Sequence, residues 1–122
     1  MLDHVTFGVS DIERSRAFYD RALPSLGIER VYVEDDCAGY GASDKAFFWI
    51  GLKGTAQTGA HVAFATADRE TVDRFYQAAL AAGGRDNGAP GLRPHYHADY
   101  YGAFVLDPDG HNIEAVCHRK IA

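Results

Sequence analysis

The hydrophobic pattern predicts a strand followed by a helix, and it does so twice along the chain. Residues 2–9 alternate apolar and polar positions, and residues 60–66 repeat that alternation, so both segments are predicted strands. Apolar residues then recur at helical spacing, which predicts a helix capped by Ser10 with Glu13 and a second helix capped by Asp68. The predicted helix ends are Pro24 and Gly27 in the first copy and Gly83 and Gly84 in the second.

The two halves also agree residue by residue. Residues 4–27 and 61–84, aligned at a constant offset of 57, are identical at ten of 24 positions, where average composition would give about one or two. Most of the shared residues are core or capping residues, which any duplicated fold would keep. The exception is the histidine pair His4 and His61. Because two-fold pseudo-symmetry brings equivalent positions face to face, this pair is the first candidate for function.

Short strand-like runs follow each predicted helix, so each half is expected to be a β-α-β-β-β module. We expect an α+β fold in which residues 1–122 form a single domain of two tandem modules, 1–57 and 58–122. Residues 87–100 form the least regular part, and long loops in small domains are often functional. The predicted runs are residues 30–34, 39–42 and 46–52 in the first half and residues 84–88, 101–106 and 112–117 in the second.

Composition and charge narrow the possible functions. The formal net charge is −5 without a cluster of Lys or Arg, which argues against nucleic acid as a partner. The sequence shows neither an apolar run near 18 residues nor a basic and apolar leader, so we expect no membrane span, no signal peptide and a cytoplasmic location. Cys37 and Cys117 are not spaced as a metal or redox motif and are expected to be reduced packing residues.

A candidate third partner for the two histidines lies in the last predicted strand. Glu114 is a carboxylate within an apolar strand, where burial is costly unless the charge is paired or bound to a cation. Two imidazoles and one carboxylate match a three-ligand metal site with open coordination positions. We therefore predict that His4, His61 and Glu114 are metal ligands. The alternative interpretation is a pair of core histidines kept by duplication, with Glu114 buried against one of them without metal.

The chain resembles the vicinal oxygen chelate superfamily, which includes glyoxalase I, fosfomycin-resistance thiol transferases, bleomycin-resistance proteins and extradiol dioxygenases. The resemblance is carried by LDHVTFGVSDIERSRAFYDRAL, GAHVAFATADRETVDRFYQAAL and YYGAFVLDPDGHNIEAV, almost the whole chain. It implies curled mixed sheets around a cavity and a divalent ion (Fe, Mn, Zn, Ni or Co) on His4, His61 and Glu114. It also implies a homodimer, in which His4 joins His61 and Glu114 across chains if the strands pair that way.

One departure from glyoxalase I restricts what the resemblance implies. That enzyme takes a further glutamate from the last strand of its first module, whereas residues 46–52 of this chain contain no carboxylate. This argues against methylglyoxal chemistry. What remains is a metal-dependent enzyme, of the lyase, transferase or dioxygenase type, that acts on a small oxygen-chelating substrate. The alternative is a metal-free protein resembling the bleomycin-resistance type, and the negative charge would suit a cationic drug.

The irregular segment supplies the other polar candidates. His95 and His97 share a face if the segment is extended, and either is a candidate general acid or base. The alternative is that both are solvated loop histidines. Arg93 is a candidate to grip an anionic substrate group, although exposed loop arginines are common. The remaining candidates are Tyr101 for catalysis and Tyr100, Trp49 and Phe47 for substrate binding.

Overall fold

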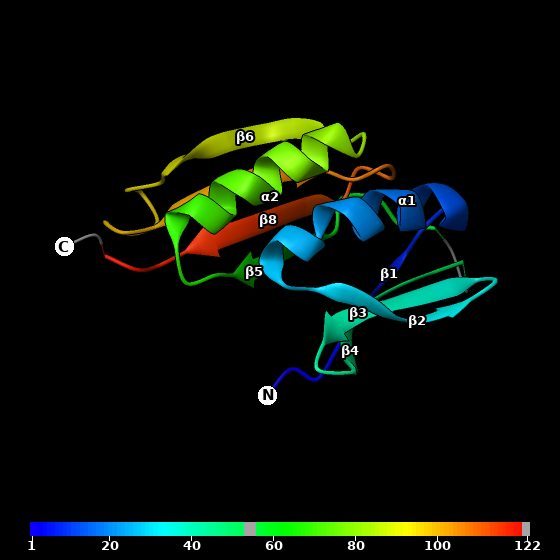
Figure 1. Ribbon diagram of the computed structural model, residues 1–122. Coiled ribbons are helices and arrows are strands. Elements are labelled where there is room, and N and C mark those ends of the chain that lie inside the picture. The colour runs from blue at the N-terminus through cyan, green and yellow to red at the C-terminus, as the bar shows by residue number, and fades with distance from the viewer. Residues whose placement is uncertain (53–55, 121–122) are drawn as a thin grey trace.

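A computed structural model describes residues 1–52 and 56–120, which form two four-stranded sheets and two α-helices, as the predicted α+β class requires. Figure 1 shows the two helices lying next to each other, with one sheet behind α2 and the other beneath α1. The first module contains β1 (Val5–Gly8), α1 (Ile12–Ala22), the short 3-10 helix η1 (Pro24–Leu26), β2 (Glu29–Glu34), β3 (Cys37–Ala42) and β4 (Lys45–Gly51). The second contains β5 (His61–Ala65), α2 (Arg69–Ala81), β6 (Arg85–Leu92), β7 (Tyr101–Leu106) and β8 (Asn112–Cys117).

Both modules have the same strand order, which confirms the predicted repeat. The sheets run β1-β4-β3-β2 and β5-β8-β7-β6, and in each the first strand is parallel to the last one. Thr6 pairs with Trp49 in the first module, and Ala63 pairs with Glu114 in the second. Thr6 and Ala63 are equivalent at the offset of 57. Trp49 therefore occupies the position in the first module that Glu114 occupies in the second.

The helix caps are duplicated, but the first one differs from the prediction. Asp11, and not Ser10, caps α1 by accepting a hydrogen bond from the Arg14 backbone N–H at 3.1 Å. Asp68 caps α2 in the same way, as predicted. The side chain of Ser10 donates instead to Asp109 at 2.5 Å. Ser10, which the local sequence pattern predicted as the cap, is therefore used in a contact between the two modules.

Strand β6 extends further than the sequence predicted. It runs through Leu92, so residues 87–92 of the segment 87–100 form a strand and not a loop. The pairing register shifts on both sides of Gly88, whose φ is +148°, and Pro90 within the strand removes one backbone donor. Both features are tolerated because β6 lies at the edge of its sheet.

Helix α1 packs against both modules. Tyr19 contacts Phe48 of β4 with ring centroids 5.1 Å apart, and Phe48 in turn contacts Phe64 of β5 at 5.6 Å. Phe18 lies on the second sheet, where Gly84 leaves space for it: a Cβ at Gly84 would lie 2.7 Å from Phe18 Cε1. The two modules thus share one hydrophobic core.

We expect Gly84→Ala to lower the free energy of unfolding by about 2 kcal/mol, because overpacking strains a filled core. The added Cβ would also lie 2.5 Å from Val105 Cγ1 and 2.8 Å from the backbone oxygen of Ala79, so a shift of Phe18 alone would not relieve it. Urea denaturation followed by circular dichroism measures the loss. Gly83→Ala is the control: Gly83 has a positive φ but open space around it, so this variant shows the cost of backbone conformation without the cost of overpacking. Equal stability of Gly84→Ala and wild type would contradict the packing.

A buried histidine fastens the two modules together. His111 is fully buried, its Nδ1 accepts a hydrogen bond from the Ala60 backbone N–H at 3.1 Å, and its Nε2 lies 3.0 Å from the backbone oxygen of Gly8. Because a carbonyl only accepts, Nε2 carries the proton. The neighbouring Asp107 carboxylate accepts from the buried hydroxyl of Tyr19 at 2.5 Å. These polar contacts connect the turn before β8 to β1 and α1.

No helix within residues 1–52 and 56–120 combines the length and apolar character needed to cross a membrane.

Candidate functional site

Strands β5 and β8 bring His61 and Glu114 together. His61 Nε2 lies 3.1 Å from Glu114 Oε1; the glutamate side chain is 2% exposed and the imidazole 46%. His61 Nδ1 lies 2.9 Å from the backbone oxygen of Asn112, so Nδ1 carries a proton. A lone pair on Nε2 would repel the carboxylate. The contact therefore needs a proton on one of the two atoms, Nε2 or Oε1, or a cation between the two groups.

Tyr100 forms a hydrogen bond with the other carboxylate oxygen of Glu114. Its hydroxyl donates to Glu114 Oε2, and Gly102 leaves the space, since a Cβ there would lie 3.2 Å from Oε2. Burial raises the pKa of Tyr100, and the Glu114 carboxylate raises that pKa further. The phenol therefore stays protonated near neutral pH and acts as a fixed donor that orients the carboxylate.

The third predicted ligand lies apart from this pair in the single chain. His4 Nδ1 is 2.8 Å from Asp3 Oδ1, and Lys45 Nζ is 3.1 Å from the same carboxylate. The His4 side chain is 55% exposed. Among the described residues of one chain, no three His, Cys, Asp or Glu side chains gather closely enough to hold a metal ion. One chain thus brings two of the three predicted ligands together.

The loop after β6 is held by a histidine pair. His97 Nδ1 accepts from the Asp99 backbone N–H at 3.1 Å, so its proton lies on Nε2, which is 2.8 Å from His118 Nδ1. Tyr100 packs edge-on against both imidazoles, with centroids 5.4 Å and 5.2 Å away. Sequence reasoning assigned His118 no role. It follows Val116 on the Glu114 face of β8, and the two-residue period is the signal that places it there.

Tyr101 faces away from this site. Its hydroxyl donates to Asp73 of α2 at 2.6 Å, and the Arg69 guanidinium lies 5.0 Å from its ring centroid. Burial, followed by the hydrogen bond to Asp73, raises the pKa of Tyr101 to about 12. Successive residues of a strand point to opposite faces. Of the two neighbouring tyrosines, Tyr100 reaches Glu114, and the structure does not bring Tyr101 to the predicted catalytic position.

A cavity of about 320 Å³ is lined by residues that contact His61, although His61 and Glu114 are not among its lining residues. Arg93, His95, Phe104 and Asn112 are among the residues that line it. Phe104 pairs across the strands with Glu114, and its ring stacks on His61 at 6.3 Å. Phe104 and Asn112 were not predicted, although both lie at even spacing along the strands that carry Tyr100 and Glu114.

The two predicted wall residues of the first module lie in different cavities. Trp49 lines a cavity of about 290 Å³ with the carboxylates of Glu34 and Asp36. Phe47 lines another cavity of about 230 Å³ between β1 and β5. Cys37, also at the Trp49 cavity, has a pKa raised by burial and then by Asp36. A raised pKa disfavours the thiolate, which agrees with a structural role.

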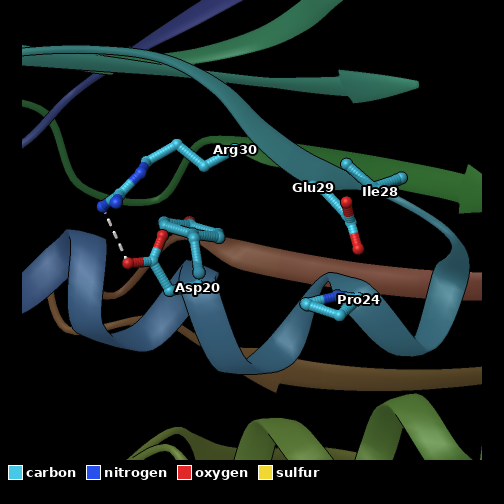
Figure 2. A pocket seen from close by; sticks show the side chains of 6 residues that line it. Asp20, Pro24, Ile28, Glu29 and Arg30 are labelled. Carbon is cyan, nitrogen blue, oxygen red and sulfur yellow. Dashed lines mark hydrogen bonds and ion pairs between the residues drawn. The ribbon is translucent and has the colours of Figure 1, made fainter. Parts of the chain in front are cut away.

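A further pocket of about 220 Å³ lies between α1 and β2 (Figure 2). Its two main polar side chains bind each other, because Arg30 Nη1 donates to Asp20 Oδ2 at 2.9 Å. The other oxygen of Asp20 accepts from Tyr40 at 2.9 Å. Both oxygens of Asp20 are therefore already bonded within the chain.

Comparison with known proteins agrees with this architecture. A protein from Albidiferax ferrireducens T118, described as a glyoxalase/bleomycin resistance protein, is 33% identical, with 97% of this chain and 98% of that chain covered and a TM-score of 0.80. A glyoxalase-related enzyme from Fulvimarina pelagi is 23% identical, with coverages of 96% and 87% and a TM-score of 0.75. Lactoylglutathione lyase from Agrobacterium tumefaciens shares the fold at 15% identity, with coverages of 96% and 92% and a TM-score of 0.71.

No curated protein matches the chain. The family model named Glyoxalase/Bleomycin resistance protein/Dioxygenase superfamily matches residues 1–115, which include the His61 and Glu114 pair and both modules. The chain therefore belongs to the glyoxalase/bleomycin resistance protein/dioxygenase superfamily.

Proposed function

We propose that the protein is a divalent-metal-dependent enzyme that acts on a small, oxygen-chelating substrate by transfer, isomerisation or oxygen insertion. The observation that carries this proposal is the buried Glu114 carboxylate, whose Oε1 lies 3.1 Å from His61 Nε2. Metal-binding histidines usually donate their other ring N–H to a carbonyl or carboxylate, as His61 does to Asn112. A divalent ion bound by both atoms would remove the repulsion between their lone pairs.

The donor set fits an ion of the type Fe, Mn, Zn, Ni or Co, which accept imidazole nitrogen and carboxylate oxygen. When bound, such an ion supplies polarisation of substrate oxygens and stabilisation of developing negative charge. Tyr100 holds Oε2 of Glu114, which leaves Oε1 directed at His61. The phenol therefore positions the carboxylate as a ligand.

We further propose that the working unit is a homodimer in which His4 of a second copy joins His61 and Glu114. Two observations support it: His4 is half exposed, and it precedes β1, a strand at the edge of its sheet. Exposed edges are where second chains usually pair. This arrangement would complete the three-ligand set that one chain lacks among its described residues.

The positions of His95 and Trp49 suit particular roles in the proposed reaction. His95 lines the cavity beside Phe104 and is the better placed general acid or base, because His97 Nε2 is engaged by His118. Trp49 stands where the second module has Glu114, so the first module offers no equivalent carboxylate. This supports a reaction other than that of glyoxalase I.

Metal content tests the proposal directly. Protein purified without chelator should retain about one Mn, Fe, Co, Ni or Zn per site, measured by elemental analysis. The metal that binds is then added back to metal-free protein as its chloride salt, at about 100 times its Kd. This should stabilise the protein by about 2.7 kcal/mol, which is visible as a rise in Tm. Absence of retained metal together with absence of any Tm rise across the five ions would refute the proposal.

A second candidate function is metal-free sequestration of a cationic small molecule. It is favoured by the Trp49 cavity, where Tyr32 lies 5.4 Å from Trp49 and the carboxylates of Glu34 and Asp36 line the wall. Aromatic faces and carboxylates both attract organic cations. Adding bleomycin in place of metal separates the candidates. A rise in Tm with bleomycin and none with metals would favour sequestration.

A further inference from the structure

The cavity lined by Phe104 and Asn112 also has a guanidinium, that of Arg93, held in place at its wall. Arg93 Nη2 donates to the backbone oxygen of Ala89 at 2.8 Å, and the guanidinium carbon lies 5.3 Å from the Phe104 ring centroid. Two glycines make room for it: a Cβ at Gly88 would lie 3.1 Å from Nη2, and one at Gly91 would lie 3.2 Å from Nη1. The backbone of β6 and the Phe104 ring therefore hold the guanidinium in a defined position without a ligand.

Most of the binding capacity of this guanidinium remains unused. It has five N–H donors, and one of them is used in the bond to Ala89. Among the residues described, Arg93 takes part in none of the ion pairs, whereas Arg30 and Arg74 are each paired with a carboxylate. A fixed, unneutralised guanidinium is a strong site for a carboxylate or phosphate, because it offers two parallel charge-assisted hydrogen bonds.

Phe104 and Asn112 connect this cavity to the proposed metal ligands, since both residues line it. The backbone oxygen of Asn112 binds His61 Nδ1, and the Phe104 ring stacks on the His61 imidazole with centroids 6.3 Å apart. A ligand held by Arg93 would therefore lie against the two residues that contact His61.

We propose that the substrate of this enzyme is a small organic anion, whose carboxylate or phosphate binds Arg93 while its other oxygen atoms lie toward His61 and Glu114. This inference rests on the proposed function, because it orients the rest of the molecule toward His61 and Glu114. Phe104, which contacts both Arg93 and His61, forms the floor that joins the two ends of the cavity. A cavity of about 320 Å³ suits a molecule of a few carbons.

Calorimetric titration tests the anion site with three probes: L-malate, inorganic phosphate and uncharged glycerol, each with metal-free and metal-loaded protein. We expect malate or phosphate to bind, glycerol not to bind, and Arg93→Gln to weaken the anion by about tenfold or more. Arg85→Gln, an exposed change at the other end of β6, should leave the affinity unchanged. Arg93→Lys, which keeps the charge without the planar pair of donors, should give an intermediate affinity.

The outcomes separate this inference from the proposed function. If both anions fail to bind, or bind equally to wild type and Arg93→Gln, the anion site is refuted, whatever the metal result. If malate binding depends on Arg93 but no metal is retained, the anion site stands and the metal-dependent function fails. Should Arg93→Gln not fold, the comparison of Arg93→Lys with wild type decides in its place.

Discussion

The His61→Ala variant is expected to bind divalent metal more than about a hundredfold more weakly than wild type, because it removes a proposed ligand whose orientation is fixed in advance. The Asn112 carbonyl holds the His61 imidazole, and Tyr100 holds the Glu114 carboxylate, so the two donors meet without rearrangement. Calorimetric titration with zinc measures the loss. In metal-free protein the same change should lower the free energy of unfolding by only about 1 kcal/mol, since the imidazole is half exposed.

Two further variants make this result specific. His118→Ala removes another histidine near the site that is not a proposed ligand, and it should bind zinc as wild type does. His4→Ala should weaken zinc binding and make it independent of dimer formation, which analytical ultracentrifugation follows. If His61→Ala binds zinc with the wild-type affinity, the metal site lies elsewhere or does not exist.

The His111→Ala variant is expected to lose about 3 kcal/mol of unfolding free energy, from two buried partners left unpaired and a cavity in the core. The backbone N–H of Ala60 and the backbone oxygen of Gly8 each lose their hydrogen bond. The ring also packs against Phe7, with centroids 4.8 Å apart. Since these contacts join the two modules, we expect one cooperative transition at lower urea concentration.

Urea denaturation followed by the fluorescence of Trp49, the single tryptophan, measures this loss. His118→Ala serves again as the matched control, because its imidazole is exposed and its removal should change stability by about 0.5 kcal/mol or less. A loss below about 1 kcal/mol for His111→Ala would mean that the neighbouring backbone finds other partners, and that the imidazole does not fasten the modules.

Part of the candidate site was predictable because it depends on neighbouring strands. His61 begins one strand and Glu114 lies within the strand parallel to it, and the family resemblance implied that residues of these two strands meet. Tyr100 and Tyr101 were not separable in the same way. Adjacent residues of a strand face opposite sides, but the sequence did not show which of the two faces Glu114. The register of β7 against β8 decides it.

The histidines illustrate a second limit. The repeat singled out His4 and His61 as equivalent, yet in one chain His4 binds Asp3 while His61 binds Glu114. The partners of His111 and His118 could not be predicted, because each lies far along the chain: Gly8 for His111 and His97 for His118. Long-range hydrogen bonds leave no periodic signal.

The sequence by itself determined the duplicated module and its strand and helix order, since these follow from residue periodicity and the repeat, while its resemblance to a known family implied that Glu114 joins a histidine. Tertiary structure alone decided that His111 joins the modules, that Ser10 binds Asp109 in place of capping α1, and that Arg93 lies on Phe104. The physical reason is that periodicity fixes which face a side chain occupies, while the partner it meets depends on how distant faces pack.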